Sequence, residues 1–288
     1  MRGPSWIRTF CRFGSKRRLV ATIEWLRELP KAGPLPQLWH TFAIAMEDGS
    51  RIEIPPELNG PVGSGQGGYC CGAFAALVGG AAEVTLRSPV PLGKPLTPSH
   101  GEGGDASVHD GDRLIAEVRT ARPQVEVPEP ISLSEAERAR ERFPGHGDEA
   151  FARCFVCGTA REDSQRVWPG KVEGHRLVAS PWTPSADWLG EDGVVRPEFL
   201  WATLDCPASF APLVDNADFV AMLGRLTVEV RDATPMGEAH LITAWPIASD
   251  GRKHRTGAAL FSAAGDLRAV AEAVLIQLEE VPGAARCG

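Results

Sequence analysis

Strand-like segments, in which hydrophobic and polar residues are interleaved, dominate the C-terminal half of the chain. Asp250-Gly251 and Ala264-Gly265 mark turns between them, because glycine in such pairs favours the backbone of a tight turn. The strands predicted for this half are Arg176–Pro181, Leu223–Arg231, Glu238–Ile247, His254–Ser262 and Leu267–Leu278. Those predicted for the N-terminal half are Val84–Ser88, Lys94–Ser99 and Arg113–Thr120, with an irregular glycine-rich stretch between the last two.

Two further segments, Gly68–Val78 and Pro197–Ala211, are apolar on nearly all sides and are predicted to be helices. Pro197 and Glu198 suit the first turn of a helix, where proline costs no hydrogen bond and a carboxylate meets the positive end of the dipole. A helix that is apolar all round is buried on most sides. One such helix followed by an antiparallel run of strands predicts an α+β fold in which a curved sheet encloses the helix.

The two halves of the chain are weakly similar in the same order. The segment Val84–Gly93 matches Val228–Gly237 at a valine, an arginine, a proline and a glycine, 144 residues apart. Gly111-Asp112 and Gly265-Asp266 each open a predicted strand, at an offset of 154 residues. A diverged internal duplication leaves this kind of pattern, so we expect two tandem copies of one unit.

With this organisation the chain resembles the double-hotdog, thioesterase-like superfamily over roughly residues 50–280. The resemblance is carried by Asn59-Gly60-Pro61, by Gly65-Gln66-Gly67-Gly68-Tyr69 and by Trp201-Ala202-Thr203-Leu204-Asp205-Cys206-Pro207. It implies two hotdog units, each an antiparallel sheet around a central helix, packed as a pseudo-dimer. The units would span residues 46–127 and 154–281, with 128–153 as a linker and 282–288 as a tail.

The Leu204-Asp205 pair is similar to the Leu-Asp pair of type II acyl-CoA thioesterases, in which the aspartate lies on the second unit's helix and activates water. The resemblance thus implies Asp205 as the catalytic residue. Burial in an apolar helix would raise the pKa of this carboxyl group toward a value useful for a general base. A solvated or helix-capping aspartate is the alternative.

The glycine-rich segment before the first helix is the expected substrate-binding element. Backbone N–H groups at a helix start can donate to a thioester carbonyl, and glycines let the substrate approach. A tight turn with close helix–sheet packing is the alternative. We expect the glycine turn of the first unit to meet Asp205 of the second at one surviving site. The substrate-binding residues expected here are Asn59, Gln66, Gly67, Gly68 and Tyr69.

The resemblance is incomplete at the other catalytic positions. In these thioesterases the aspartate works with a hydroxyl residue and a glutamine on neighbouring strands. Those places fall near Ile247 and Ala273, whose side chains cannot orient water. Nearby polar residues that could substitute are Asp250, Glu272 and Gln277.

The function expected from these features is binding of acyl-CoA or acyl-carrier thioesters and their hydrolysis to free acid and thiol. The alternative is a non-catalytic acyl-thioester-binding or structural protein that has lost the triad. An enoyl-thioester hydratase on the same fold would need a histidine shortly after the aspartate, and Phe210 stands there.

The motif Cys154-Phe-Val-Cys157-Gly158 supplies only two ligands of a tetrahedral zinc site. Cys206, His146 and His175 could complete one, but their spacing fits no known zinc finger. A thioredoxin-type redox motif would need a flanking βαβ pattern. We therefore expect a turn with partly buried thiols, no metal and no cofactor. Cys70-Cys71 has no base close by and is expected in the core.

A basic hairpin tip, Asp250–Arg255, stands out in an otherwise acidic body. Its Arg252 and Lys253 could bind the phosphates of coenzyme A or of a pantetheine carrier, although a solvated turn fits equally well.

The net charge of −7 disfavours a nucleic-acid partner. Residues 1–45 carry +6 and the remaining residues −13, so we expect a basic N-terminal extension, and Met46 is a second candidate start. The N-terminal segment lacks a continuous apolar stretch and a small-residue cleavage site, so we do not expect a secretory signal, and no apolar run is long enough to span a membrane. Its seven cysteines show no disulfide spacing, which predicts reduced thiols and a cytoplasmic location. A homodimer is compatible with the fold.

Overall fold

One antiparallel sheet dominates the computed structural model, which describes residues 51–60, 63–146 and 151–279. In these residues the strand order is β1-β3-β4-β5-β2-β8-β11-β10-β9-β7-β6. The strands of the N-terminal half are β1 (Ile52–Glu53), β2 (Ala82–Leu86), β3 (Pro95–His100), β4 (Ala106–Asp110) and β5 (Arg113–Thr120). Those of the C-terminal half are β6 (Gly170–Lys171), β7 (Val178–Trp182), β8 (Ala221–Val230), β9 (His240–Asp250), β10 (Lys253–Phe261) and β11 (Leu267–Gln277).

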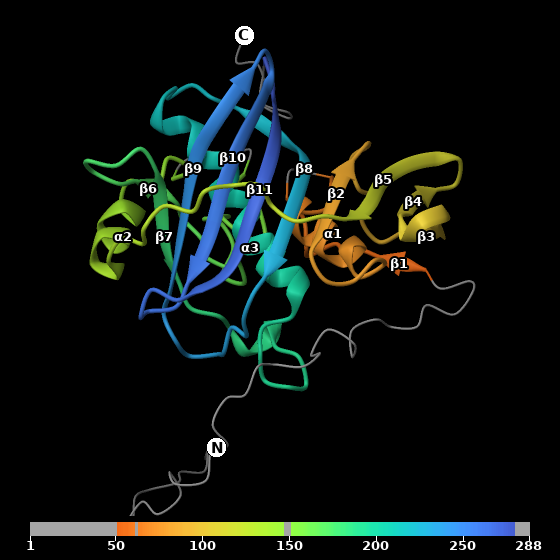
Figure 1. Ribbon diagram of the computed structural model, residues 1–288, viewed down its shortest axis with the longest axis horizontal. Coiled ribbons are helices and arrows are strands. Elements are labelled where there is room, and N and C mark those ends of the chain that lie inside the picture. The colour runs from red at the N-terminus through yellow and green to blue at the C-terminus, as the bar shows by residue number, and fades with distance from the viewer. Residues whose placement is uncertain (1–50, 61–62, 147–150, 280–288) are drawn as a thin grey trace, which may run out of the picture. The chain divides into compact units, whose positions relative to one another are not determined.

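The helices are few, as expected for this fold class. The α-helices of the described residues are α1 (Gly67–Ala75), α2 (Leu133–Arg140) and α3 (Pro197–Phe210), and the 3₁₀ turns are η3 (Glu102–Gly104), η4 (Ala186–Trp188) and η5 (Ala211–Val214). Helix α3 packs on β8 to β11, α1 packs on β2 and β5, and the two helices contact each other (Figure 1). A large antiparallel sheet with few helices is the hotdog-like α+β arrangement that the sequence predicts.

The sheet buries residues on both faces near β9. Successive side chains of a strand point to opposite faces. Ile242 therefore joins the core that holds α1 and α3, whereas Leu241 joins a smaller cluster with Ala136 and Ala139 of α2. Helix α2 thus covers the face opposite α3.

The two halves of the chain join through the pairing of β2 with β8, in which Val84 lies opposite Leu226. Glu83 of β2 is nearly buried and forms ion pairs with Arg119 of β5 and Arg225 of β8. The sheet therefore continues across the junction without a break.

Both predicted core helices and all the predicted strands are present within a few residues of their predicted ends. The two-residue strands β1 and β6 and the 3₁₀ turns were not predicted, and neither were two longer elements. Strand β4 occupies part of the stretch expected to be irregular, and α2 lies inside the predicted linker 128–153. Ser132 caps α2 in a capping box with Glu135.

Several expectations fall outside the described residues: the basic extension 1–45, the start at Met46, Pro61 and the tail 282–288. None of the helices in the described part of the chain has the length and apolarity needed to cross a membrane.

Candidate functional site

Asp205 of α3 lines a cavity of about 620 Å³ whose walls come from both halves of the chain. The N-terminal half contributes Ser64 to Gly67 and Leu86 to Val90. The C-terminal half contributes α3 and the segment 217–224, and most of that lining is apolar. The apolar lining residues include Val90, Phe151, Phe210, Leu213, Phe219, Val220, Met222, Leu223 and Ile276. The cavity can therefore hold an apolar chain with its polar end near Asp205.

The carboxylate of Asp205 is buried and held by donors from both halves. Its Oδ2 accepts hydrogen bonds from Nε2 of Gln66 at 2.7 Å and from the backbone N–H of Gly68 at 2.8 Å. Its Oδ1 accepts a longer one, 3.3 Å, from the hydroxyl of Ser209 on the same helix. Oδ2 is thus firmly bonded, whereas Oδ1 keeps lone-pair capacity for a further donor.

Burial raises the pKa of Asp205 to about 6, and the hydrogen bonds from Gly68, Ser209 and Gln66 partly offset that effect. The alternative of a solvated or capping aspartate is therefore wrong for this residue, whose side chain is buried.

Helix α1 has Gln66 as its N-cap residue and contains the glycines Gly67, Gly68 and Gly72. Gln66 caps the helix, since its Oε1 accepts a hydrogen bond from the N–H of Tyr69 at 2.6 Å. A Cβ on Gly68 would lie 2.5 Å from Cβ of Asp205, and one on Gly72 would lie 2.6 Å from Cα of Glu198. These glycines let α1 pack directly on α3. The close packing is thus between helices α1 and α3 rather than between a helix and the sheet. Gly68 both packs against α3 and donates a hydrogen bond from its backbone N–H to Asp205.

The expected substrate-binding residues fall in different places. Gln66 and Gly67 line the cavity with Asp205. Gly68 packs against α3 and bonds Asp205. Asn59 donates to the carbonyl of Arg153 at 3.0 Å and accepts from Arg161 at 3.0 Å, so it anchors the turn that carries Cys154.

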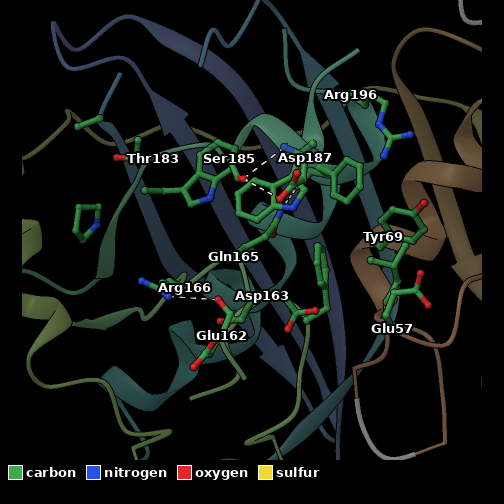
Figure 2. A pocket seen from close by; sticks show the side chains of 18 of the residues that line it. Glu57, Tyr69, Glu162, Asp163, Gln165, Arg166, Thr183, Ser185, Asp187 and Arg196 are labelled. Atoms are coloured by element: carbon green, nitrogen blue, oxygen red, sulfur yellow. Dashed lines mark hydrogen bonds between the residues drawn. The ribbon is translucent and has the colours of Figure 1, made fainter. Parts of the chain in front are cut away.

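Tyr69 lines a second cavity, of about 820 Å³, which Figure 2 shows together with Glu57 and Arg196. In that cavity the hydroxyl of Ser185 contacts Asp187, and Arg166 donates to the carbonyl of Glu162. Burial raises the pKa of Tyr69 to about 12. This cavity is larger, but Asp205 and Gln66 line the smaller one, so the smaller one is the candidate active site.

The basic hairpin tip lies beside one wall of the candidate site. Arg252 and Lys253 are exposed at the turn between β9 and β10. The neighbouring ring of His254 packs against Phe219 with centroids 4.6 Å apart, and Phe219 lines the cavity.

Two of the three residues proposed to replace the missing polar partners are engaged elsewhere, and the third, Asp250, is exposed. Glu272 forms an ion pair with Arg255, and Oε1 of Gln277 accepts a hydrogen bond from Nε2 of His254 at 3.1 Å. Ala273 is buried in the main core, and Ile247 packs beside the cluster near α2. In the described part of the chain, Gln66 and Ser209 are the residues whose side chains form hydrogen bonds with the Asp205 carboxylate.

Cys154, Cys157 and Cys206 are all buried, and their sulfur atoms lie within 4.8 Å of one another. The expectation of partly buried thiols is therefore wrong for this turn. His146 packs instead against Phe143 and Trp168. Cys70 and Cys71 are buried in the core of α1, as predicted.

Sequence reasoning missed Ser209 and the direct contact between Gln66 and Asp205. The position of Ser209, four residues after Asp205, is a local signal, because side chains four apart share one face of a helix. The contact between residues 66 and 205 depends on how the two helices pack.

No protein-family model matches the sequence, and no curated protein matches it either. Solved structures do match the fold. The tesB protein of Mycobacterium avium subsp. paratuberculosis is 13% identical, with a TM-score of 0.51 over 78% of this chain and 90% of that one. A Thermobifida fusca YX protein with the provisional designation thioesterase II is 13% identical, with a TM-score of 0.52 over 80% of this chain and 93% of that one. By this similarity the chain has the hotdog fold of thioesterase-like proteins.

Proposed function

We propose that this protein hydrolyses acyl thioesters, with Asp205 as the general base. The observation that carries the proposal is the buried Asp205 carboxylate at the wall of an apolar cavity, held by Gln66 and Gly68 from the other half of the chain. A buried carboxylate is costly unless it is well hydrogen-bonded, so such an arrangement is common at functional sites.

The order of elements supports two hotdog units in a pseudo-dimer. Each half has a core helix followed by four strands: α1 and β2 to β5 in the first, and α3 and β8 to β11 in the second. Strand β1 precedes α1, and β7, with the two-residue strand β6 before it, precedes α3. From the junction outward the sheet reads β2, β5, β4, β3 on one side and β8, β11, β10, β9 on the other. Equivalent strands thus take equivalent places about the β2–β8 pair.

The proposed reaction uses the free capacity of Oδ1. A water bound there would attack the thioester carbonyl carbon and give its proton to the Asp205 carboxylate. The tetrahedral intermediate would then collapse, and the thiolate would leave and take up that proton, which yields a free acid and a thiol. The helix start at Gly67 lines the cavity and is the candidate donor to the developing oxyanion.

Gln66 and Ser209 supply the amide and the hydroxyl that Ile247 and Ala273 cannot. Gln66 fixes Oδ2 at 2.7 Å, which leaves the carboxylate one orientation, and Ser209 approaches the opposite oxygen. We infer that these two side chains orient the carboxylate and the water in place of the strand residues used by type II acyl-CoA thioesterases.

The test is Asp205→Asn, assayed by thiol release from acyl-CoAs of different chain length. Asparagine keeps the size of the side chain and can still accept from Gln66 and Gly68 and donate to Ser209, so the fold should persist. Loss of a general base predicts a fall in kcat of about 100-fold or more. The kcat of Ser209→Ala should fall by a smaller factor. An unchanged rate in folded Asp205→Asn would contradict the proposal.

A non-catalytic thioester-binding protein is the second candidate. It is favoured by the hydrogen bond from Gly68, because the backbone N–H that could meet a substrate carbonyl already binds Asp205. This function predicts measurable acyl-CoA binding without thiol release at any chain length. The cytoplasmic location and the homodimer remain predictions from the sequence, and a role in lipid metabolism is proposed because acyl thioesters are the proposed substrates.

A further inference from the structure

Three cysteines far apart in the sequence converge beside the candidate active site. Cys154 and Cys157 lie on one turn and Cys206 on α3, and all three line the cavity of Asp205. The sulfur atoms of Cys154 and Cys206 are 3.9 Å apart, and all three sulfurs lie within 4.8 Å of one another. A thiol that only fills space in a core, as Cys70 and Cys71 do, needs no other thiol beside it.

The spacing of the sulfur atoms fits ligands of one metal ion. With a zinc–sulfur bond of about 2.3 Å, two ligands of a tetrahedral site lie about 3.8 Å apart. Sulfur atoms joined in a disulfide are only about 2.05 Å apart. The 3.9 Å between Cys154 and Cys206 therefore matches the edge of a zinc–thiolate tetrahedron.

The turn that presents Cys154 and Cys157 is tightly constructed. The N–H of Gly158 donates to the carbonyl of Cys154 at 2.8 Å, and a Cβ on Gly158 would lie 2.3 Å from that oxygen. The N–H of Phe155 donates to the carbonyl of Asn59 at 2.8 Å. Asn59 and Arg161 both donate to the carbonyl of Arg153. These hydrogen bonds fix the turn, so both thiols lie close to α3 without a bound ion.

Metal binding at this cluster would require its thiols to ionise. The thiolate is the form of cysteine that binds metal ions. A cation would displace the thiol protons and take their place between the sulfurs.

We propose that Cys154, Cys157 and Cys206 bind one thiophilic divalent cation, with Zn²⁺ as the expected ion. Three protein ligands leave a fourth position, which faces the cavity and would take water or a ligand atom from it. The site would pin the Cys154–Cys157 turn to α3 next to Asp205. This metal site goes beyond the proposed hydrolysis, and its test does not require catalytic activity.

The test measures metal in the full-length chain, purified under reducing conditions without chelators and incubated with Zn²⁺ alone. Elemental analysis after gel filtration should give one zinc per chain. Cys157→Ala and Cys206→Ala should each lose it, and Cys71→Ala, which removes a buried thiol elsewhere in the core, should keep it. Co²⁺ in place of zinc should give thiolate-to-cobalt charge-transfer bands and the visible bands of tetrahedral cobalt.

A second measurement uses the unmodified chain, so its result does not depend on whether the cysteine variants fold. Zinc should slow alkylation of Cys154, Cys157 and Cys206, mapped by mass spectrometry, and a chelator should restore it, while Cys70 and Cys71 change little. Zinc content equal in the unmodified chain and folded Cys206→Ala would overturn the proposal. A Cys154–Cys157 disulfide that forms in preference to zinc binding, or alkylation unaffected by zinc, would do the same.

Discussion

At the scale of single residues, we infer that the exposed cations of the β9–β10 turn, which lies beside one wall of the candidate site, meet the charged end of the substrate. Nε of Arg252 donates to the carbonyl of Gln277 at 3.0 Å, so the turn is fixed to β11. The ring of His254 joins the turn to Phe219 of the cavity wall. Phosphates of a CoA-type thioester could then lie against Arg252 and Lys253 while the acyl group enters the cavity.

Replacing Arg252 and Lys253 together by alanine should raise KM for acyl-CoA and leave kcat nearly unchanged. Two exposed ion pairs, each worth about 0.2–1 kcal/mol, correspond to a rise of about 2- to 30-fold. Steady-state kinetics on acyl-CoA and on the matching N-acetylcysteamine thioester, which lacks phosphates, would measure it. The control is Lys94→Ala, which removes an exposed cation from the other half of the chain.

The effect on KM should shrink as salt is added, because exposed charges are screened. An equal rise of KM with both substrates would contradict this assignment and indicate a general loosening of the cavity.

Single residues also show how much of the candidate site could be predicted from the sequence. Asp205 could be predicted because one acid in an apolar helix is conspicuous and its neighbour Leu204 matches a known pair. The resemblance predicted that the glycine turn meets Asp205, but not the hydrogen bond from Gln66, because the two residues are 139 apart and their distance depends on helix packing. Cys206 was one of three candidates to join Cys154 and Cys157, and their spacing could not single it out from His146 and His175.

At the scale of elements, the contact of α1 with α3 determines where the site is. Glycine at positions 68 and 72 allows the backbones to approach, and that approach brings the N–H of Gly68 within 2.8 Å of Asp205. The same contact therefore contributes to both the core and the candidate active site.

Gly68→Ala should destabilise the protein by about 1–3 kcal/mol, because its Cβ would overlap α3 in a packed core. An alanine in an ordinary helix position would stabilise instead. Urea denaturation measures the loss, and thiol release should fall with it as α1 moves away from Asp205.

The matched control is Gly101→Ala, at an extended residue whose added Cβ would lie 3.7 Å from its nearest neighbour. It should change stability by less than about 0.5 kcal/mol. If Gly68→Ala were as stable as this control, the two helices would not be in the described contact.

The elements that escaped prediction have local explanations. Helix α2 has a readable capping box, Ser132 with Glu135, but few apolar residues follow it, so its segment resembles a linker. Strand β4 follows a run of glycines, so its segment reads as part of an irregular stretch. Long apolar helices and long strands were predictable because their patterns repeat.

At the scale of the whole molecule, the β2–β8 pair makes the two halves depend on each other. Val84 and Leu226 are opposite and fully buried there, and Glu83 links strands on both sides. The internal repeat predicted two related units, but the repeat alone does not say which strands meet.

Val84→Ala should lower the stability of both halves by a common amount of about 2 kcal/mol. Residues 51–127 contain no tryptophan, so among the described residues tryptophan fluorescence follows the second half. Its midpoint in urea should shift together with that of far-ultraviolet circular dichroism.

Met236→Ala, at a half-exposed side chain, is the control and should leave both midpoints in place. Separate transitions in the two signals for Val84→Ala would mean that the halves unfold independently.

The two ends of the sheet bear on how the protein behaves at high concentration. An open strand edge is a template for pairing with other chains, and short edge strands or covering elements reduce that hazard. In the part of the chain that the structure describes, the outermost strands β1 and β6 have two residues each. Helix α2 lies against β6, where Arg142 donates to the carbonyl of Lys171. A sheet this wide therefore offers little edge for aggregation, and its growth stops at both ends.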